Sequence, residues 1–394
     1  TLQQAASTRY GFSPSRTMSI AQKLYEGVEM GGGPVGLITY MRTDSVNVSQ
    51  DARQSARDFI IKKFGKEYYP SKGNIFRSRS GAQEAHEAIR PTSAGMTPEH
   101  VKAQLTEDQF RLYEVIWQRT MACQMVPALV DTVQVEFDCD SDATFRANGS
   151  VIAFPGFLMA YEESRPAGKE EKENRLPDMN EGDVVKLEEI RAEQHFTEPP
   201  PRYSEASLVK ALEDYGIGRP STYASIIQTL VRRKYVDLDR RRFIPTDTGR
   251  VVARFLEMHF EPYVDYKFTA RMEDTLDEIS RGEMHWIPPL MQFWKPFIRR
   301  IEEKQETVSR QDAKLTRILG KDPKTGKDVS VRLGRFGPHA QIGSVEDEEK
   351  PKFAGLHPGQ RLETITLEEA LELFKLPRKL GETPEGEPVS ASIG

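Results

Sequence analysis

The sequence predicts a multidomain α+β protein, and three observations support this fold class. The chain has 394 residues, more than one hydrophobic core usually organises, so two to four domains are expected. Residues 1–126 show mainly helical periodicity, whereas residues 132–137 alternate apolar and polar side chains as a half-buried strand does. Residues 313–394 repeat a segment of their own sequence.

Composition and charge are those of an ordinary soluble protein. The 55 basic and 60 acidic residues give a net charge of −5, which does not indicate a nucleic-acid partner. Cys123 and Cys139 lack the paired spacing of a zinc site, which favours a reducing, cytoplasmic location and no zinc. No stretch is long and apolar enough for a membrane span. Because the first residue is Thr1 and not Met, we expect a piece of a longer protein.

The helical domain, residues 1–126, is predicted to contain two helices on either side of a short extended segment. Apolar spacing predicts a first helix whose buried face carries Ile20, Leu24 and Tyr25. Ser49 is the predicted N-cap of the second helix. Between them, residues 36–42 are rich in β-forming side chains, so we expect an extended conformation.

Residues 127–199 are predicted to form a β-rich domain. After the alternating segment, Asn148-Gly149 has the composition of a tight hairpin turn. Val184–Leu187 is expected to continue the β region. The prolines at 199–201 predict a stiff boundary to the next domain.

Residues 200–312 are predicted to form a helical domain with winged-helix character. Ser204 is a candidate cap of one helix, and a second helix can start at Ser221. Residues 234–236 and 242–244 have the pattern of two short strands around a charged turn. Two helices followed by a hairpin are the outline of a winged helix, a common DNA-binding motif.

The basic residues of this domain are concentrated in residues 219–254. That range contains nine Lys and Arg against three Asp, a surplus of six positive charges. Such a surplus attracts phosphate even in an acidic chain. An ordinary solvated helix face is an equally good explanation from charge alone.

Residues 313–394 are predicted to hold one complete repeat and part of a second. Residues 319–334 are echoed by residues 380–394 with one deletion, so we expect the second copy to continue beyond the last residue. Thr366 and Glu369 have the spacing of a capping box, and each unit is therefore predicted to be a hairpin followed by a helix.

Tyr40 and Arg42 are the candidate catalytic residues. Two positions apart in an extended segment, they would point to the same side. A phenol has a pKa near 10, so its attack on a phosphodiester needs a nearby positive charge, which Arg42 would supply. Spacing alone favours the alternative, in which Tyr40 packs in a core and Arg42 is a surface cation.

Two further groups of residues could contact phosphate. His86 and Arg90 lie in a polar segment, although its composition equally describes a surface helix with ordinary ion pairs. Arg219, Ser221 and Thr222 follow two glycines at a predicted helix start, where free backbone N–H groups bind anions. The alternative there is an ordinary turn and helix cap.

Four long segments resemble bacterial type IA DNA topoisomerases, in the order of that family. They are residues 36–45, 82–92, 217–224 and 268–274. The resemblance implies the gate and arch of that family, with a helical, winged-helix-like domain and C-terminal β-hairpin and helix repeats. It also implies that Tyr40 becomes a 5′-phosphotyrosine and that Arg42 positions the cleaved phosphate.

The same resemblance assigns DNA-binding roles outside the catalytic pair. It implies that His86, Arg90, Arg219, Ser221 and Thr222 contact DNA. In the C-terminal repeats, Phe336 is an aromatic side chain that would stack on single-stranded bases. Single-stranded DNA is therefore the expected partner, and the protein is expected to be a monomer.

The resemblance further implies ATP-independent relaxation of negatively supercoiled DNA, with Mg²⁺ held by an N-terminal toprim domain that lies outside this chain. We therefore expect the 394 residues to bind DNA but to be inactive by themselves. Two alternatives stay open. One is a tyrosine-based strand transferase of another class, which would leave a 3′-phosphotyrosine, and the other is a non-catalytic winged-helix DNA-binding module.

Overall fold

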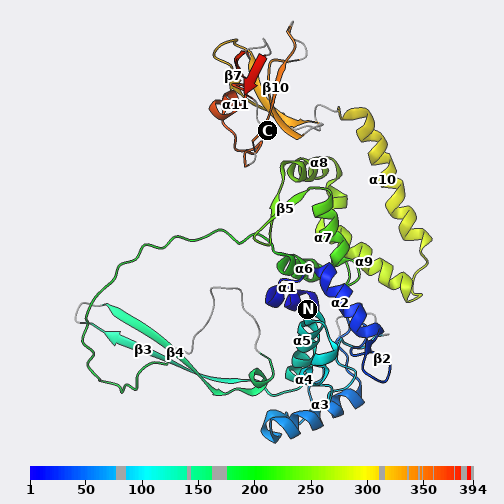
Figure 1. Cartoon of the computed structure of the whole chain (residues 1–394), viewed down its shortest axis with the longest axis vertical. Helices are drawn as coiled ribbons and strands as arrows, with labels where there is room; N and C mark the ends of the chain where they lie inside the picture. The colour runs from blue at the N-terminus through cyan, green and yellow to red at the C-terminus, as the bar shows by residue number, and fades with distance from the viewer. Residues whose placement is uncertain are drawn as a thin grey trace. The chain divides into compact units, whose positions relative to one another are not determined.

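The computed structural model (Figure 1) contains two compact units, Thr1–Ser225 and Ile226–Gly394. Helices and antiparallel sheets occur in both units, which confirms the predicted α+β class. The scheme of four domains stays a prediction. The structure describes residues 1–76, 86–139, 143–161, 175–309, 316–334, 337–344, 347, 349–357, 359–376, 378–382 and 388–391.

The first unit begins with helices packed around one hydrophobic core. Ile20 and Leu24 are buried in this core, as predicted, but 40% of Tyr25 is exposed. The helices and short 3-10 turns are α1 (Leu2–Tyr10), α2 (Pro14–Glu26), α3 (Gln50–Lys63), η1 (Lys66–Tyr68), α4 (Pro98–Val101), η2 (Lys102–Gln104), α5 (Glu107–Cys123) and η3 (Gly156–Met159).

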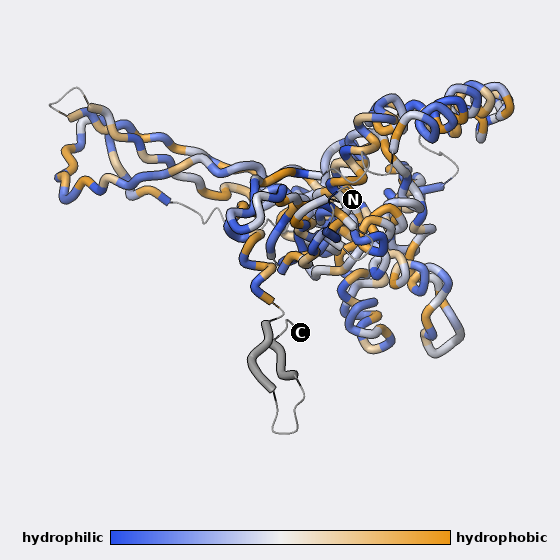
Figure 2. The backbone as a smooth tube through the Cα atoms, turned by 90° about the horizontal axis from the view of Figure 1, so that it is seen from above, coloured by the Kyte–Doolittle hydropathy of each residue, from blue (hydrophilic) through white to orange (hydrophobic). Residues whose placement is uncertain are grey.

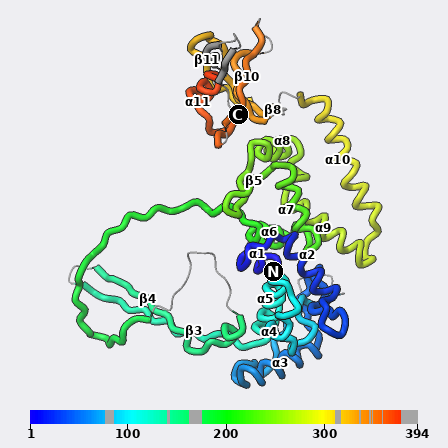
Figure 3. Tube along the Cα trace, in the orientation of Figure 1, coloured from blue at the N-terminus to red at the C-terminus, as the bar shows by residue number. Residues whose placement is uncertain are grey.

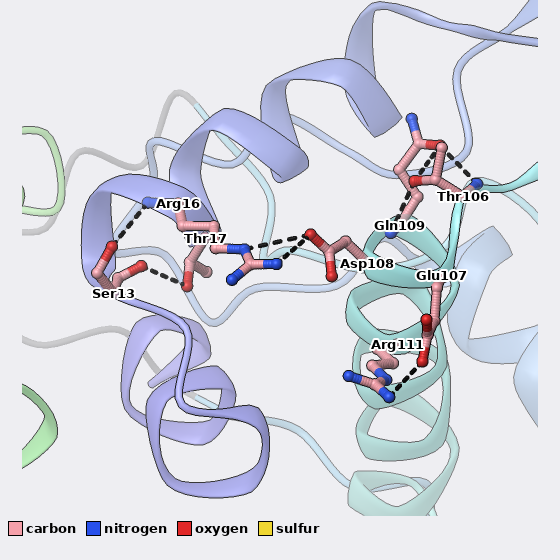
Figure 4. A network of polar contacts seen from close by, with 8 residues as sticks. All are labelled: Ser13, Arg16, Thr17, Thr106, Glu107, Asp108, Gln109 and Arg111. Atoms are coloured by element: carbon pink, nitrogen blue, oxygen red, sulfur yellow. Dashed lines mark hydrogen bonds and ion pairs between the residues drawn. The ribbon is translucent and has the colours of Figure 1, made fainter.

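Polar contacts at the helix starts orient α2 against α5 (Figure 4). The Ser13 hydroxyl accepts a hydrogen bond from the Arg16 backbone N–H at 3.2 Å and so caps α2. Thr106 and Gln109 form a capping box at the start of α5. The Arg16 guanidinium then donates to Asp108 of α5 at 2.6 Å. Because both charged groups are partly exposed, this ion pair contributes little to stability and mainly sets orientation.

A long two-stranded hairpin follows, formed by β3 (Leu129–Asp138) and β4 (Thr144–Phe154). This confirms the strand predicted at residues 132–137. The predicted turn at Asn148-Gly149 is wrong, because these two residues pair with Gln134 and Val133 inside the ladder. An Asn-Gly pair is only a local turn signal, and a continuous ladder between two long strands outweighs it. Figure 2 shows hydrophobic and hydrophilic residues mixed along both strands.

Residues 175–203 connect this region to the next helix (Figure 3). The strand predicted at Val184–Leu187 is wrong, because these residues form no strand in the structure and Val184 is 98% exposed. Apolar β-forming residues become a strand only where another strand supplies hydrogen bonds, and none pairs with this segment among the described residues.

Two helices and a hairpin follow in the predicted order. The Ser204 cap of α6 (Glu205–Asp214) is confirmed by a capping box. The second helix, α7 (Tyr223–Arg232), begins two residues after the predicted Ser221. The hairpin consists of β5 (Val236–Asp239) and β6 (Arg242–Pro245). Its turn residues Arg240 and Arg241 have positive φ angles of 44° and 63°, as a tight hairpin turn requires.

Three longer helices follow in the second unit. They are α8 (Asp247–Val264), α9 (Tyr266–Ser280) and α10 (Ile287–Thr307). In the part of the chain that the structure describes, no helix has both the length and the apolar character needed to cross a membrane.

The C-terminal part of the second unit is a small sheet with one helix. Its antiparallel strand order is β10-β9-β8-β7. A hairpin and a helix were predicted, and the structure adds two strands to that hairpin. The Thr366 and Glu369 capping box is confirmed at the start of the helix. The elements are β7 (Arg317–Lys321), β8 (Asp328–Gly334), β9 (Gly337–Ile342), β10 (Lys352–Gly355) and α11 (Leu367–Leu373).

The internal repeat of the sequence is also visible in the backbone. The last two strands, β11 (Arg378–Glu382) and β12 (Pro388–Ala391), form an antiparallel hairpin like that of β7 and β8. Both hairpins have a register shift at the same place, between Ile318 and Gly320 in the first and between Lys379 and Gly381 in the second. The second copy therefore reproduces the irregular start of the first.

Candidate active site

Tyr40 lies in the first unit, at the end of a short segment held on both sides by backbone hydrogen bonds. The Leu37 N–H donates to the carbonyl of Leu24 in α2 at 2.8 Å. On the other side, Ile38 forms an isolated antiparallel bridge with Pro91. Leu37 and Ile38 are buried, so the core anchors the residues that precede Tyr40.

A glycine is required where this segment passes α2. A Cβ atom built on Gly36 would lie 2.8 Å from the backbone oxygen of Tyr25, closer than real Cβ contacts come. The Gly36 carbonyl accepts a hydrogen bond from the Thr92 hydroxyl at 2.9 Å. The close approach brings the start of the segment alongside the end of α2.

The aromatic ring of Tyr40 lies between two other rings. The Tyr25 ring meets it edge-on, with centroids 5.3 Å apart and an interplanar angle of 71°. The His86 ring lies at 4.9 Å, tilted by 45°. Tyr40 itself is half-buried, and its hydroxyl forms no hydrogen bond with any described residue. The structure thus brings His86 next to Tyr40, as a shared site requires.

Sequence reasoning missed Tyr25 as a neighbour of Tyr40. The chain turns back between them through a hairpin of β1 (Val28–Glu29) and β2 (Pro34–Val35). The three glycines at residues 31–33 form the turn and were a signal in the sequence that could have predicted this return.

Among the described residues, the structure shows no hydrogen bond or cation–π contact between Arg42 and Tyr40. The chain bends at Met41 and Arg42, and Met41 is buried with 1% exposure. The extended conformation expected for residues 36–42 therefore ends before Arg42. The two-residue periodicity of a strand then no longer predicts that the side chains of Arg42 and Tyr40 point to the same side. Arg42 is exposed and forms no hydrogen bond or ion pair with the described residues, so its role stays a prediction.

Arg90 is engaged in an ion pair. Its guanidinium donates to Glu87 at 2.6 Å and to the Pro91 carbonyl at 3.0 Å, and 15% of the side chain is exposed. The hydrogen bond from Arg90 holds the pKa of Glu87 below its usual range. Because that pKa is lowered, the pair is complete above the usual carboxyl pKa and is lost as pH falls through the lowered value. A phosphate at Arg90 would compete with Glu87.

Arg219, Ser221 and Thr222 lie together in a turn before α7. The Arg219 N–H donates to the Thr222 hydroxyl at 2.9 Å, and the guanidinium donates to the carbonyl of Gly218 at 2.8 Å. Ser221 and Thr222 are exposed. The turn is tied to α1, since the side-chain amide of Gln3 donates to the Pro220 carbonyl at 3.2 Å.

The basic region continues in the second unit. Arg250 forms an ion pair with Glu363 at 2.8 Å, so one cation of this region is already paired within the protein. Seven other basic residues of the region have exposed side chains: Arg232, Arg233, Lys234, Arg240, Arg241, Arg242 and Arg254. This arrangement suits contact with a phosphate backbone better than a buried structural role.

The remaining predictions concern stacking and metal binding. Phe336 lies outside the described residues. Among the residues that the structure describes, no group of three or more His, Cys, Asp or Glu side chains is arranged to hold a metal ion.

Residues 1–290 match the family described as DNA topoisomerase, and residues 322–385 match the topoisomerase C-terminal repeat. DNA topoisomerase 1 of Xylella fastidiosa strain Temecula1 is 55% identical over 399 residues, covering all of this chain and 49% of the relative. DNA topoisomerase 1 of Rickettsia bellii is 41% identical over 468 residues, covering all of this chain and 58% of the relative.

A solved structure shares the fold. Full-length topoisomerase I from Thermotoga maritima matches 91% of this chain and 57% of its own, with a TM-score of 0.66 and 35% sequence identity. This match confirms the predicted multidomain α+β architecture. The chain spans about half the length of the curated relatives it matches. Because the family match covers most of the chain and agrees with the fold, the chain belongs to the bacterial type IA DNA topoisomerases.

Proposed function

We propose that the full-length protein containing this chain relaxes negatively supercoiled DNA without ATP, by cutting and rejoining one strand. The observation that best supports this is the environment of Tyr40. Its ring is fixed by Tyr25 and His86, while its hydroxyl has no hydrogen bond within the described residues. A phenol held this way is oriented but free to react.

In the proposed reaction, the Tyr40 oxygen attacks the phosphorus of one phosphodiester. A bond forms between the phenolic oxygen and phosphorus, and the bond from phosphorus to the 3′-oxygen breaks. The phenolic proton is lost and the leaving 3′-oxygen gains a proton, so the DNA end is a 3′-hydroxyl and the enzyme carries a 5′-phosphotyrosine. Rejoining is the reverse, and the covalent bond preserves the energy of the phosphodiester, so no nucleotide is consumed.

Arg42 is proposed to stabilise the charge that develops on the phosphate. We expect Arg42→Ala in the full-length protein to slow cleavage by about 10²- to 10³-fold while changing DNA affinity much less, because a cation aimed at a transition state matters most during the chemical step. Single-turnover cleavage of a labelled oligonucleotide and its equilibrium binding measure the two effects. Equal losses in rate and affinity would instead make Arg42 a simple phosphate anchor.

His86, Arg90, Arg219, Ser221 and Thr222 are proposed to contact DNA. The exposed hydroxyls of the turn before α7 and the exposed basic residues of the second unit support this assignment. Arg90 would have to exchange its bond with Glu87 for a phosphate. We further propose that single-stranded DNA is preferred and that the protein is a cytoplasmic monomer.

Phe336 is proposed to stack on single-stranded bases. We expect Phe336→Ala to weaken binding of a single-stranded oligonucleotide by about 1–3 kcal/mol and to leave duplex binding nearly unchanged, because only unpaired bases offer a free face. Fluorescence titrations with both ligands measure this. An unchanged affinity for the single strand removes the stacking role.

Mg²⁺ is proposed as the metal of the full-length protein, where it would supply positive charge near the cleaved phosphate when bound. The described residues do not form a site for it. We propose that the acidic ligands lie in polypeptide outside these 394 residues. Zinc and ATP have no proposed role.

The proposed function is tested by incubating the full-length protein with negatively supercoiled plasmid, with Mg²⁺ and without nucleotide. Relaxation is the expected result. A protein that binds the plasmid but never changes its linking number would be a non-catalytic winged-helix module. Relaxation that leaves a blocked 3′ end, when stopped with denaturant, would indicate a strand transferase of another class.

A further inference from the structure

One hydroxyl joins the segment before Tyr40 to the segment that carries His86. Thr39 Oγ1 donates a hydrogen bond to the Ala88 carbonyl at 2.7 Å and accepts one from the Arg90 N–H at 2.9 Å. A threonine hydroxyl has one proton to donate and lone pairs to accept with. The Thr39 hydroxyl therefore both donates to and accepts from the segment that carries His86.

We propose that Thr39 is a positioning residue of the cleavage reaction, whose hydroxyl holds His86 against Tyr40. Thr39 directly precedes Tyr40, and Ala88 lies two residues after His86. The two rings that these bonds bring together have centroids 4.9 Å apart. This inference rests on the proposed function, because it assigns Tyr40 and His86 to one reaction.

The bonds of the Thr39 hydroxyl are separable from those that hold the fold. The Thr39 N–H donates to the Arg90 carbonyl at 2.9 Å, and the Thr92 N–H donates to the Leu37 carbonyl at 3.0 Å. Neither bond needs the hydroxyl. We therefore expect the two segments to stay paired when only the Thr39 hydroxyl is removed.

The position of Ala88, unlike the pairing of the two segments, depends on the Thr39 hydroxyl. The Ala88 N–H donates to the Asn47 carbonyl at 2.8 Å, so a second tether holds it from the side of α3. Without the Thr39 hydroxyl, the Ala88 carbonyl and the Arg90 N–H lose this partner, whereas the bonds between Ala88 and Asn47 and between Glu87 and Ser49 remain. The position of His86 is then set by these tethers to Asn47 and Ser49 rather than by the segment that carries Tyr40.

The test uses Thr39→Val and Thr39→Ser in the full-length protein, with single-turnover cleavage, oligonucleotide affinity and thermal unfolding as readouts. Valine keeps the shape and removes the hydroxyl, whereas serine keeps the hydroxyl. We expect Thr39→Val to cleave at least about tenfold more slowly and to lose much less affinity than rate, since small displacements of reacting groups have large kinetic effects whereas His86 is only one of several proposed DNA contacts. Thr39→Ser is expected to restore most of the rate.

A double-mutant cycle shows whether Thr39 acts through His86. In a His86→Ala background, Thr39→Val is expected to add little further loss, because the side chain it positions is already absent. Thr92→Val is the matched control, since it removes a hydroxyl that bonds the same pair of segments, at Gly36, 2.9 Å away. It is expected to cleave at close to the wild-type rate.

The outcomes distinguish this inference from the proposed function. If wild-type protein forms no covalent adduct with DNA, both are overturned. If wild type and Thr39→Val form the adduct at the same rate, the inference alone is overturned. Equal slowing by Thr39→Val and Thr92→Val, or full additivity with His86→Ala, likewise overturns it by making the effect a general loosening of the segment.

Discussion

Tyr40→Phe in the full-length protein is expected to abolish both the covalent DNA adduct and plasmid relaxation while leaving DNA affinity nearly unchanged. The substitution removes only the nucleophilic oxygen, and the ring still packs between Tyr25 and His86. Loss of the only group that forms the covalent bond leaves no alternative route, so the effect is a complete loss rather than a slower rate. Denaturing gels of a labelled oligonucleotide measure the adduct.

Tyr25→Phe is the matched control for this prediction. It removes the hydroxyl of the neighbouring tyrosine and keeps the edge-on ring contact. The adduct is expected to form as in wild type. Residual adduct in Tyr40→Phe, or its disappearance in Tyr25→Phe instead, would show that Tyr40 is not the nucleophile.

The 394 residues, produced as a separate protein, are expected to bind single-stranded DNA but not to relax supercoiled plasmid. The described residues contain Tyr40 but form no group that could hold a metal ion. Each missing source of charge stabilisation lowers a rate by about 10²- to 10³-fold. Without the proposed Mg²⁺ ligands, relaxation should be undetectable even at high protein concentration.

Binding by the separate chain should weaken as salt increases. The exposed basic side chains between Arg232 and Arg254 would release counterions from phosphate, and the logarithm of the affinity should fall linearly with the logarithm of the salt concentration. The control is the same chain carrying Tyr40→Phe, which should bind equally well. Tyrosine-dependent relaxation by the separate chain with Mg²⁺ would contradict the proposed division of the active site.

Local features of the fold were predictable from the sequence because short-range hydrogen bonds determine them. Ser49, Ser204 and Thr366 were predicted as N-caps, and each accepts a hydrogen bond from a backbone N–H in the first turn of its helix. The hairpin of β5 and β6 was predicted to within three residues at each strand end for the same reason. A cap depends on neighbours within a few positions, which the sequence shows directly, whereas the turn signal at Asn148-Gly149 was outweighed by the ladder of β3 and β4.

Features set by distant residues were predicted less well. The strand expected at Val184–Leu187 has the right composition but no partner in the structure. The segment of Tyr40 was expected to be extended through Arg42, yet burial of Met41 in the core is accompanied by a bend. In both places the composition favours a strand, but tertiary contacts decide the conformation.

In the candidate site, too, local features were predictable from the sequence and contacts between distant residues were not. The chemistry of Tyr40 and its resemblance to a family were readable from residue types. The contact between Tyr40 and His86 was not, because it depends on the bridge between Ile38 and Pro91 and on the Thr39 hydroxyl. Such pairing between segments far apart in sequence has no local signal.

The identity of the covalently linked residue decides whether Tyr40 is the nucleophile. The full-length protein is incubated with a single-stranded oligonucleotide, stopped with denaturant and digested, and the peptide that carries nucleotide is sequenced by mass spectrometry. We predict that the nucleotide is attached to Tyr40 through the 5′-phosphate of the cleaved strand and that the other product has a free 3′-hydroxyl. Attachment to another residue would show that Tyr40 is not the nucleophile, and attachment through a 3′-phosphate would exclude the proposed reaction.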